Sequence, residues 1–214
     1  GEQLYIEGFG LSMAMKEQRT AHDVIQDIMR HIDGVLYSDP ETGTLKMRLI
    51  RADYVLASLP VFDESNILEL EPSRPSWQDS INHVRVSYQG ADPDEVTIGG
   101  FRGRAASRGI ERVAASTNLA LVQSIGGLVA QDIEYHGVSD ADLAQRMADR
   151  DLRTLSYPSV TFRMKANREA HSLRPGDAFV INWPSLSISG LVCRVVKANL
   201  GVLEDGGVEV DVIE

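Results

Sequence analysis

Residues 20–34 (TAHDVIQDIMRHIDG) place their apolar side chains at the spacing of an amphipathic helix. Thr20 and Asp23 stand three residues apart, the spacing of a capping box at the start of a helix. Gly34 follows the last apolar residue and is placed to close the helix. The predicted apolar face consists of Val24, Ile25, Ile28, Met29 and Ile32.

Residues 139–158 (SDADLAQRMADRDLRTLSYP) predict a second helix. Ser139 and Asp142 repeat the capping arrangement at its start. Pro158 cannot continue a helix, because proline has no backbone N–H to donate. The predicted apolar face consists of Leu143, Ala144, Met147, Leu152 and Leu155.

Most of the remaining chain alternates apolar and polar residues, which is the period of a strand with one buried face. Residues 159–166 (SVTFRMKA) alternate most clearly, and a hairpin with a Pro-Glu-Thr-Gly turn is predicted in residues 35–50. Residues 66–71 and 81–88 predict further strands. The pattern predicts an α+β fold that is mostly antiparallel β with two helices.

The C-terminal part of the chain, residues 158–214, predicts four or five antiparallel strands with short links. The sequence Arg174-Pro-Gly-Asp177 suits a type II turn, because proline presets φ and glycine supplies a positive φ. The strand that follows ends at Trp183-Pro184, where proline cannot donate to a central ladder. This segment therefore predicts a small β-barrel or sandwich.

The net charge changes the list of possible functions. The chain of 214 residues carries a net charge of −10 with a pI of about 5.0. Nucleic-acid binders are usually basic, so specific nucleic-acid binding is not expected. The sequence contains no apolar run long enough to span a membrane and no signal peptide. It does not begin with Met, and we expect it to be a piece of a longer protein.

Residues able to support catalysis are scarce. The chain lacks the nucleophile-elbow, phosphate-loop and zinc-protease motifs, and its single cysteine, Cys193, lies in an apolar run typical of a buried thiol. His22 and His31 would lie on opposite sides of the first helix and cannot share a metal. Acidic pairs such as Asp39/Glu41 are common in any acidic protein. We therefore expect no enzyme activity, no cofactor and no metal.

Candidate interface residues come from two features. The Gly- and Arg-rich residues 90–112 form either a solvated loop or an interface arm. The two tryptophans neighbour prolines at strand boundaries, where each either caps the end of a sheet or anchors a partner. The predicted interface residues are Trp77, Arg102, Arg104, Arg108, Trp183 and Leu186.

Several segments of the chain resemble a known family. The patterns SRPSW followed by NHVRVSYQ, and NREAHSLRPGDAFVINWP, are similar to the central tail hub and tail-tip attachment proteins of long-tailed bacteriophages. Prophages and gene-transfer agents have similar proteins. The resemblance extends over roughly residues 20–214, and its two patterns are specific together. Relatives tend to have glycine where this chain has Ser187, so the conformation of that loop is open.

The resemblance implies a structural virion protein, part of a trimeric hub that closes or extends the tail tube. Residues 1–135 are expected to form an α+β hub domain, and residues 136–214 a helix with a C-terminal barrel-like domain, unless the two interlock as one unit. Expected partners are other copies of the chain, tail-tip and tail-tube proteins, and a host receptor reached through regions outside this chain. The expected location is the virion tail tip, after assembly in the bacterial cytoplasm.

Two other functions remain open at this point. One is a module that binds a host glycan or receptor through exposed aromatic residues. The other is a tail-associated cell-wall hydrolase, which needs a pair of carboxylates in a cleft.

Overall fold

The structure, a computed structural model, describes residues 2–11, 19–90, 110–201 and 206–214. The chain folds into two compact units, each built from two separate segments. Unit 1 comprises Gly1–Ile32 and Ser76–Pro158, and unit 2 comprises Asp33–Pro75 and Ser159–Glu214.

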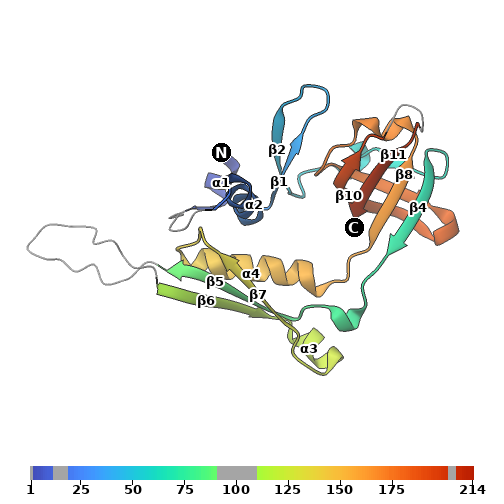
Figure 1. Ribbon diagram of the computed structural model, residues 1–214. Helices are drawn as coiled ribbons and strands as arrows, with labels where there is room; N and C mark the ends of the chain where they lie inside the picture. The colour runs from blue at the N-terminus through green and yellow to red at the C-terminus, as the bar shows by residue number, and fades with distance from the viewer. Residues whose placement is uncertain (1, 12–18, 91–109, 202–205) are drawn as a thin grey trace, which may run out of the picture. The chain divides into compact units, whose positions relative to one another are not determined.

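Unit 1 is built on a three-stranded sheet with β5 in the centre. Strand β5 (His83–Gly90) pairs antiparallel with β6 (Ile110–Thr117) and parallel with β7 (Ala130–Tyr135). Helix α4 (Ala141–Ser156) lies across one face of this sheet and contacts β5 and β6 (Figure 1). The helix and the sheet therefore form two layers with one core between them.

The core of unit 1 follows from the two periodicities of its elements. Alternate residues of β5 point toward α4, and the α4 stripe predicted from the sequence points back at them. Leu155, at the end of that stripe, is only partly buried. The buried cluster consists of Val84, Val86, Tyr88, Ala114, Tyr135, Val138, Leu143, Ala144, Met147, Ala148 and Leu152.

Besides α4, unit 1 contains three α-helices and one 3-10 helix among its described residues. Helix α3 begins after Asn118, whose side chain accepts from the N–H of Leu121 at 3.2 Å, and ends at Gly126, which has a φ of 79°. The sequence analysis did not predict α1 or α3. The bounds are α1 (Glu2–Ile6), α2 (Ala21–Ile32), the 3-10 helix η2 (Trp77–Asp79) and α3 (Leu119–Ile125).

Unit 2 contains a six-stranded sheet in the order β3-β9-β10-β11-β8-β4 and a separate hairpin of β1 and β2. The four strands from β8 to β11 pair antiparallel with one another. The strands are β1 (Gly34–Ser38), β2 (Leu45–Leu49), β3 (Val61–Phe62), β4 (Ile67–Ser73), β8 (Thr161–Ala166), β9 (Ala178–Trp183), β10 (Ile188–Asn199) and β11 (Val208–Ile213). Three 3-10 helices are η1 (Leu56–Ser58), η3 (Arg168–Ser172) and η4 (Pro184–Leu186).

The six-stranded sheet curls on itself. Strands β3 and β4 stand at opposite edges of the sheet, yet the short turn 63–66 joins them. Four residues span at most about 14 Å, so the two edges must approach one another. The Asn66 side chain fixes this turn by accepting from the N–H of Asp63 at 2.7 Å. The predicted small C-terminal barrel is confirmed, as a curled sheet completed by β3 and β4.

The inside of the curled sheet is the core of unit 2. Phe162, Met164 and Ala166 from β8 face inward together, as the alternation predicted, and Val160 packs against them partly buried. Phe62 and Phe179 meet edge to face, with ring centroids 5.2 Å apart. The α+β fold, mostly antiparallel, is thus confirmed.

The ends of the two predicted helices need correction. The Thr20 hydroxyl accepts from the N–H of Asp23 at 3.2 Å, so this cap is confirmed. Gly34 does not close the helix. Asp33 takes the left-handed conformation (φ 52°), which Asp tolerates better than most residues, and Gly34 begins β1. The second helix is capped by Asp140 and not Ser139, because the Asp140 carboxylate accepts from the N–H of Leu143 at 2.9 Å.

The compact units do not follow the division expected at residue 135. Helix α4, which the sequence analysis grouped with the C-terminal strands, packs instead on the sheet of unit 1. Strands β3 and β4, from the first half of the chain, complete the sheet of unit 2. The division into domains over residues 1–135 and 136–214 therefore remains a prediction, and it differs from the units that contacts define.

Candidate assembly surface

The turn that precedes β9 is the type II turn that the sequence predicted. Gly176 has a φ of 88°, and the N–H of Asp177 donates to the carbonyl of Arg174 at 2.9 Å. The Asp177 carboxylate accepts from the N–H of Arg174 at 2.7 Å. Arg194 donates to the carbonyl of Gly176 at 2.8 Å. The turn is therefore fixed from both sides and offers a rigid support to what packs on it.

This turn holds the β1–β2 hairpin through charged side chains. Arg174 donates to the Glu41 carboxylate at 2.8 Å, and its Nε lies 3.7 Å from Asp39. Arg48 of the hairpin pairs with Asp177 of the turn. The clamp joins two segments more than 120 residues apart in the sequence.

Asp39 is the residue on which the end of the hairpin is organised. Lys46 lies 2.5 Å from its carboxylate, and the Glu41 N–H and the Thr42 hydroxyl also donate to it. The hydrogen bond from Lys46, followed by those from Glu41 and Thr42, lowers the pKa of Asp39 to about 2. Asp39 therefore works as a structural carboxylate that closes the hairpin, and its place in a candidate catalytic pair is explained by turn formation.

One face of the hairpin is apolar and exposed. The register pairs Leu36 with Met47 and Ser38 with Leu45, so the three apolar side chains share a face. Leu45 is 72% exposed, Met47 52% and Leu36 37%. Adjacent exposed apolar side chains of this size are typical of an interaction surface. Leu36, Leu45 and Met47 are called the hairpin patch below.

The predicted interface residues Trp183 and Leu186 lie at the end of β9. Trp183 is half-buried and packs against the core of unit 2, as expected for a residue that caps a barrel end. Leu186, in η4, is 45% exposed. The Ser185 hydroxyl donates to Glu64 at 2.7 Å and ties η4 to the turn before β4. Both residues remain predicted interface positions.

Ser187, which stands where relatives tend to have glycine, adopts the conformation that glycine favours. Its φ is 58°, and its N–H donates to the carbonyl of Pro184 at 2.9 Å. The loop thus takes a left-handed conformation although a side chain is present. This answers the question that the sequence left open.

Replacing Ser187 with glycine is expected to raise the free energy of unfolding of unit 2 by about 1 kcal/mol. The left-handed conformation costs a residue with a Cβ roughly 1–2 kcal/mol, and the freedom of glycine in the unfolded chain offsets part of that gain. Denaturant titration followed by Trp183 fluorescence in a Trp77→Phe background measures the change. Gly176→Ala is the matched opposite and is expected to destabilise unit 2. Gly176 has a φ of 88°, and a Cβ there would lie 3.0 Å from Val35. A destabilised Ser187→Gly variant would contradict the prediction.

The other predicted interface residues lie elsewhere. Trp77, in η2 of unit 1, is 48% exposed and meets Tyr157 edge to face at 6.2 Å. Arg102, Arg104 and Arg108 lie outside the residues that the structure describes. The sequence analysis missed the hairpin patch, because the alternation in the hairpin predicts an apolar face but not whether the same chain covers it.

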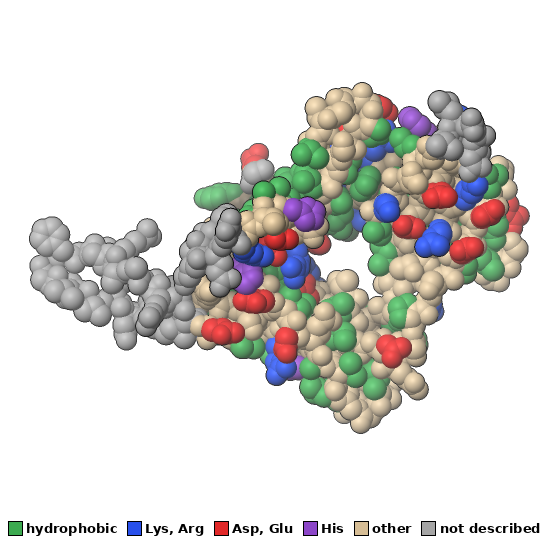
Figure 2. Space-filling model, in the orientation of Figure 1, with side chains coloured by type: hydrophobic (Ala, Val, Ile, Leu, Met, Phe, Trp, Pro, Cys, Tyr) green, Lys and Arg blue, Asp and Glu red, His purple; other side chains and the backbone are tan. Residues whose placement is uncertain are grey.

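The outer face of the unit 2 sheet carries alternating charges. The registers place Glu71, Arg163, Asp211 and Lys197 in one row across β4, β8, β11 and β10. Figure 2 shows acidic and basic side chains interspersed over this part of the surface. A groove of about 280 Å³ is lined by Arg163, Lys197, Asn199, Glu209 and Asp211. Opposite charges on neighbouring strands stabilise a sheet, which accounts for the arrangement without a ligand.

The remaining candidates for chemistry are the cysteine and the metal-ligating side chains. Cys193 is buried, as predicted, and burial raises the pKa of its thiol to about 12. Among the described residues, no group of three His, Cys, Asp or Glu side chains could hold a metal ion. No helix among them is long and apolar enough to cross a membrane.

The fold combines a curled β-sheet unit and a helix-covered sheet unit. Residues 106–197 match the model of a family described as putative phage tail protein. No curated protein matches the sequence. The resemblance to phage tail proteins is therefore confirmed by a family match over the region from β6 to most of β10.

Three solved structures share this fold. A chain of the virion of a native gene transfer agent particle has a TM-score of 0.64 at 17% identity and covers 94% of this chain. The tail protein from Neisseria meningitidis MC58 has a TM-score of 0.60 at 12% identity and also covers 94%. The 43 kDa tail protein of prophage MuSo2 from Shewanella oneidensis has a TM-score of 0.53 at 14% identity and covers 99%. The chain spans 40%, 57% and 60% of these three proteins, respectively.

Proposed function

We propose that the chain is a structural component of a phage or prophage tail tip, part of a trimeric central hub that closes or extends the tail tube. The observation that supports this most is the shared fold over 94% of the chain with a protein of an assembled gene transfer agent virion. The family match to putative phage tail proteins points the same way. The role is structural and not catalytic, and its partners are further copies and other tail-tube and tail-tip proteins.

The hairpin patch is the surface we assign to contacts between copies. It is apolar and exposed, and a charged clamp holds it in one orientation on unit 2. A preorganised apolar surface loses little conformational freedom on binding, which favours association. Trp77, Trp183, Leu186, Arg102, Arg104 and Arg108 complete the proposed set of interface residues. A host receptor would be reached through regions outside this chain.

The location is tested by immunogold electron microscopy. An antibody against this chain is applied to particles from the source strain. Gold at the distal end of the tail supports the hub or tip. Intact tails with accessible tips and no label would contradict the proposal, and glycan binding and peptidoglycan hydrolysis would then be assayed.

The double variant Leu45→Ser/Met47→Ser is expected to weaken self-association about tenfold or more, while the unfolding of unit 2 changes little. Exposed side chains contribute little to the folded monomer but are the ones buried in an interface. Sedimentation velocity over a range of concentrations measures the change.

Leu68→Ser is the matched control, because Leu68 is also in unit 2 and is 58% exposed. Equal association of the two variants would exclude the hairpin patch from the interface. A purely monomeric unmodified chain at all concentrations would count against the trimer.

A further inference from the structure

The N-terminal segment, residues 2–11, contacts the rest of unit 1 through polar groups and through Phe9. Arg146 of α4 donates to the carbonyls of Glu7 at 2.9 Å and Gly8 at 3.4 Å. The Arg146 guanidinium also lies 5.8 Å from the centre of the Phe9 ring. No residue of α1 is buried. Phe9 also packs, partly buried, against the core of unit 1, so this apolar contact and the polar contacts dock the segment together.

His31 makes the contact at the other end of the segment. It is the penultimate residue of α2 and is only 2% exposed. Its Nε2 lies 3.0 Å from the carbonyl oxygen of Gly10. A carbonyl oxygen only accepts, so Nε2 carries the hydrogen and Nδ1 is the bare nitrogen of a neutral ring. Phe9 and Tyr135 pack against the ring edge to face, at 5.9 and 6.3 Å.

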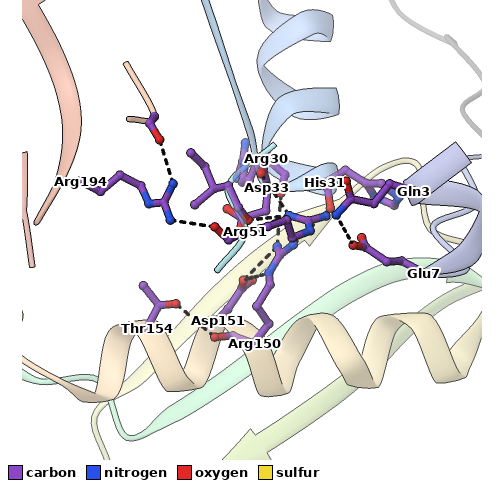
Figure 3. Close-up of polar contacts among 12 residues, drawn as sticks. Gln3, Glu7, Arg30, His31, Asp33, Arg51, Arg150, Asp151, Thr154 and Arg194 are labelled. Carbon is purple, nitrogen blue, oxygen red and sulfur yellow. Dashed lines mark hydrogen bonds and ion pairs between the residues drawn. The ribbon is translucent and has the colours of Figure 1, made fainter. Parts of the chain in front are cut away.

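The Nδ1 atom of His31 is buried and has no hydrogen-bond partner in the described part of the protein. Protonation would place an N–H there with no acceptor, which is costly in a buried site. Arg150 adds a positive charge, since it donates to the carbonyls of His31 at 3.3 Å and Arg30 at 3.2 Å. Figure 3 shows Arg150 and Asp151 on α4 reaching toward the end of α2.

The carboxylates around His31 have other charged or hydroxyl partners, although Asp27 Oδ2 makes no hydrogen bond among the described residues. On α2, Asp27 lies 2.7 Å from Arg19 and 3.0 Å from Arg30. On α4, Asp151 accepts from the Tyr135 hydroxyl at 2.6 Å and from Arg150 at 3.1 Å.

At the end of β7, Glu134 lies 3.2 Å from His136. Each carboxylate near His31 therefore has another partner, and protonation of the ring would have to compete with these contacts.

We propose that His31 is an acid-sensitive latch, which docks residues 2–11 on unit 1 while its ring is neutral and releases them when the ring is protonated. The released segment would carry Tyr5 and Ile6, which are already 86% and 76% exposed, away from the surface of unit 1. This device does not depend on the proposed tail function, since all its parts lie within unit 1.

The direction of the pH dependence follows from the surroundings of His31. Burial, and then the positive charge of Arg150, lower the pKa of His31 below its usual 6.5, although the bond to Gly10 opposes this. The pKa of His31 is lower in the docked state than in the released state, so docking is fully favoured above pH 6.5. The docking free energy is lost as the pH falls through the lowered pKa.

The test follows a dye attached at Glu2→Cys, since the buried Cys193 does not compete for labelling. The fluorescence anisotropy of the dye is expected to fall on acidification, with a midpoint below pH 6.5, as the segment becomes mobile. In a Trp183→Phe background, Trp77 fluorescence checks that unit 1 stays folded over the same range. The absence of any anisotropy change while unit 1 stays folded would overturn the latch.

Two variants separate His31 from the other titrating groups. His31→Gln keeps an amide donor for the Gly10 carbonyl but cannot be protonated, so its anisotropy is expected to stay high at acid pH. His22→Gln is the matched control on the exposed side of α2 and is expected to retain the transition. A transition that persists in His31→Gln would assign the effect to another group and refute the proposal.

His31→Phe keeps an aromatic ring in the same place but removes the bond to Gly10. Its anisotropy is expected to be low at every pH, with Trp77 fluorescence unchanged. A docked segment in this variant would show that the hydrogen bond is not the latch.

Discussion

Phe179→Ala is expected to lower the free energy of unfolding of unit 2 by about 3–5 kcal/mol, the usual cost of removing a buried phenylalanine ring. Phe179 is fully buried, meets Phe62 edge to face at 5.2 Å, and stands opposite Cys193 in the sheet.

The measurement uses the placement of the two tryptophans, one in each unit. In a Trp77→Phe background, denaturant titration of Trp183 fluorescence reports unit 2 alone. Thiol labelling of Cys193 gives a second readout, since that thiol reacts only when unit 2 opens. Leu68→Ala, an exposed position, is the control. A loss below about 1 kcal/mol would show that the core around Phe179 repacks.

Asn82→Ala is expected to lower the free energy of unfolding of unit 1 by about 2–3 kcal/mol, because it leaves two backbone groups without partners. The fully buried Asn82 side chain donates to the carbonyl of Gly127 at 2.8 Å and accepts from the N–H of Val129 at 2.8 Å. Its backbone pairs with Val129 as well. Asn82 thus anchors the loop between α3 and β7 and sets the register in which β7 joins β5.

Titration of Trp77 fluorescence in a Trp183→Phe background measures this effect. Gln123→Ala, which removes an exposed amide from α3, is the control and is expected to change the stability by less than about 0.5 kcal/mol. The same loss reported by Trp183 in a Trp77→Phe background would show that the two units unfold together. Asn82→Ala would then lower the stability of both units and not of unit 1 alone.

The elements with clear periodicity were predictable from the sequence. The alternation in residues 159–166 and the stripe on residues 139–158 led directly to β8 and α4. The Pro-Gly pair in the turn before β9 fixed its type, because only glycine adopts the required φ without strain. The nine-residue spacing of His22 and His31 predicted opposite sides of a helix, and one is exposed while the other is buried.

The sequence did not predict short elements, choices between neighbouring residues of similar type, or burial that distant residues decide. Helix α3 has seven residues, too few for a helical period to stand out against its surroundings. Asp140 and Ser139 are both good caps by type, and only the local geometry selects Asp140. Asn82 is a polar residue next to a strand, and nothing near it in the sequence marks it as buried. The hairpin patch was hidden for the same reason, since exposure depends on what the rest of the chain covers.

The order of strands in unit 2 has a consequence for synthesis on the ribosome. Strand β4 ends at Ser73, but its partner β8 begins at Thr161, with the second segment of unit 1 between them. At about 5–20 residues per second, β4 waits roughly 5–20 s for its partner to be translated. The last strand, β11, lies between β10 and β8, so the sheet closes only when the end of the described chain has left the exit tunnel. During that interval the nascent chain exposes an unpaired strand edge, and a chaperone that shields such edges should therefore raise the yield of folded protein.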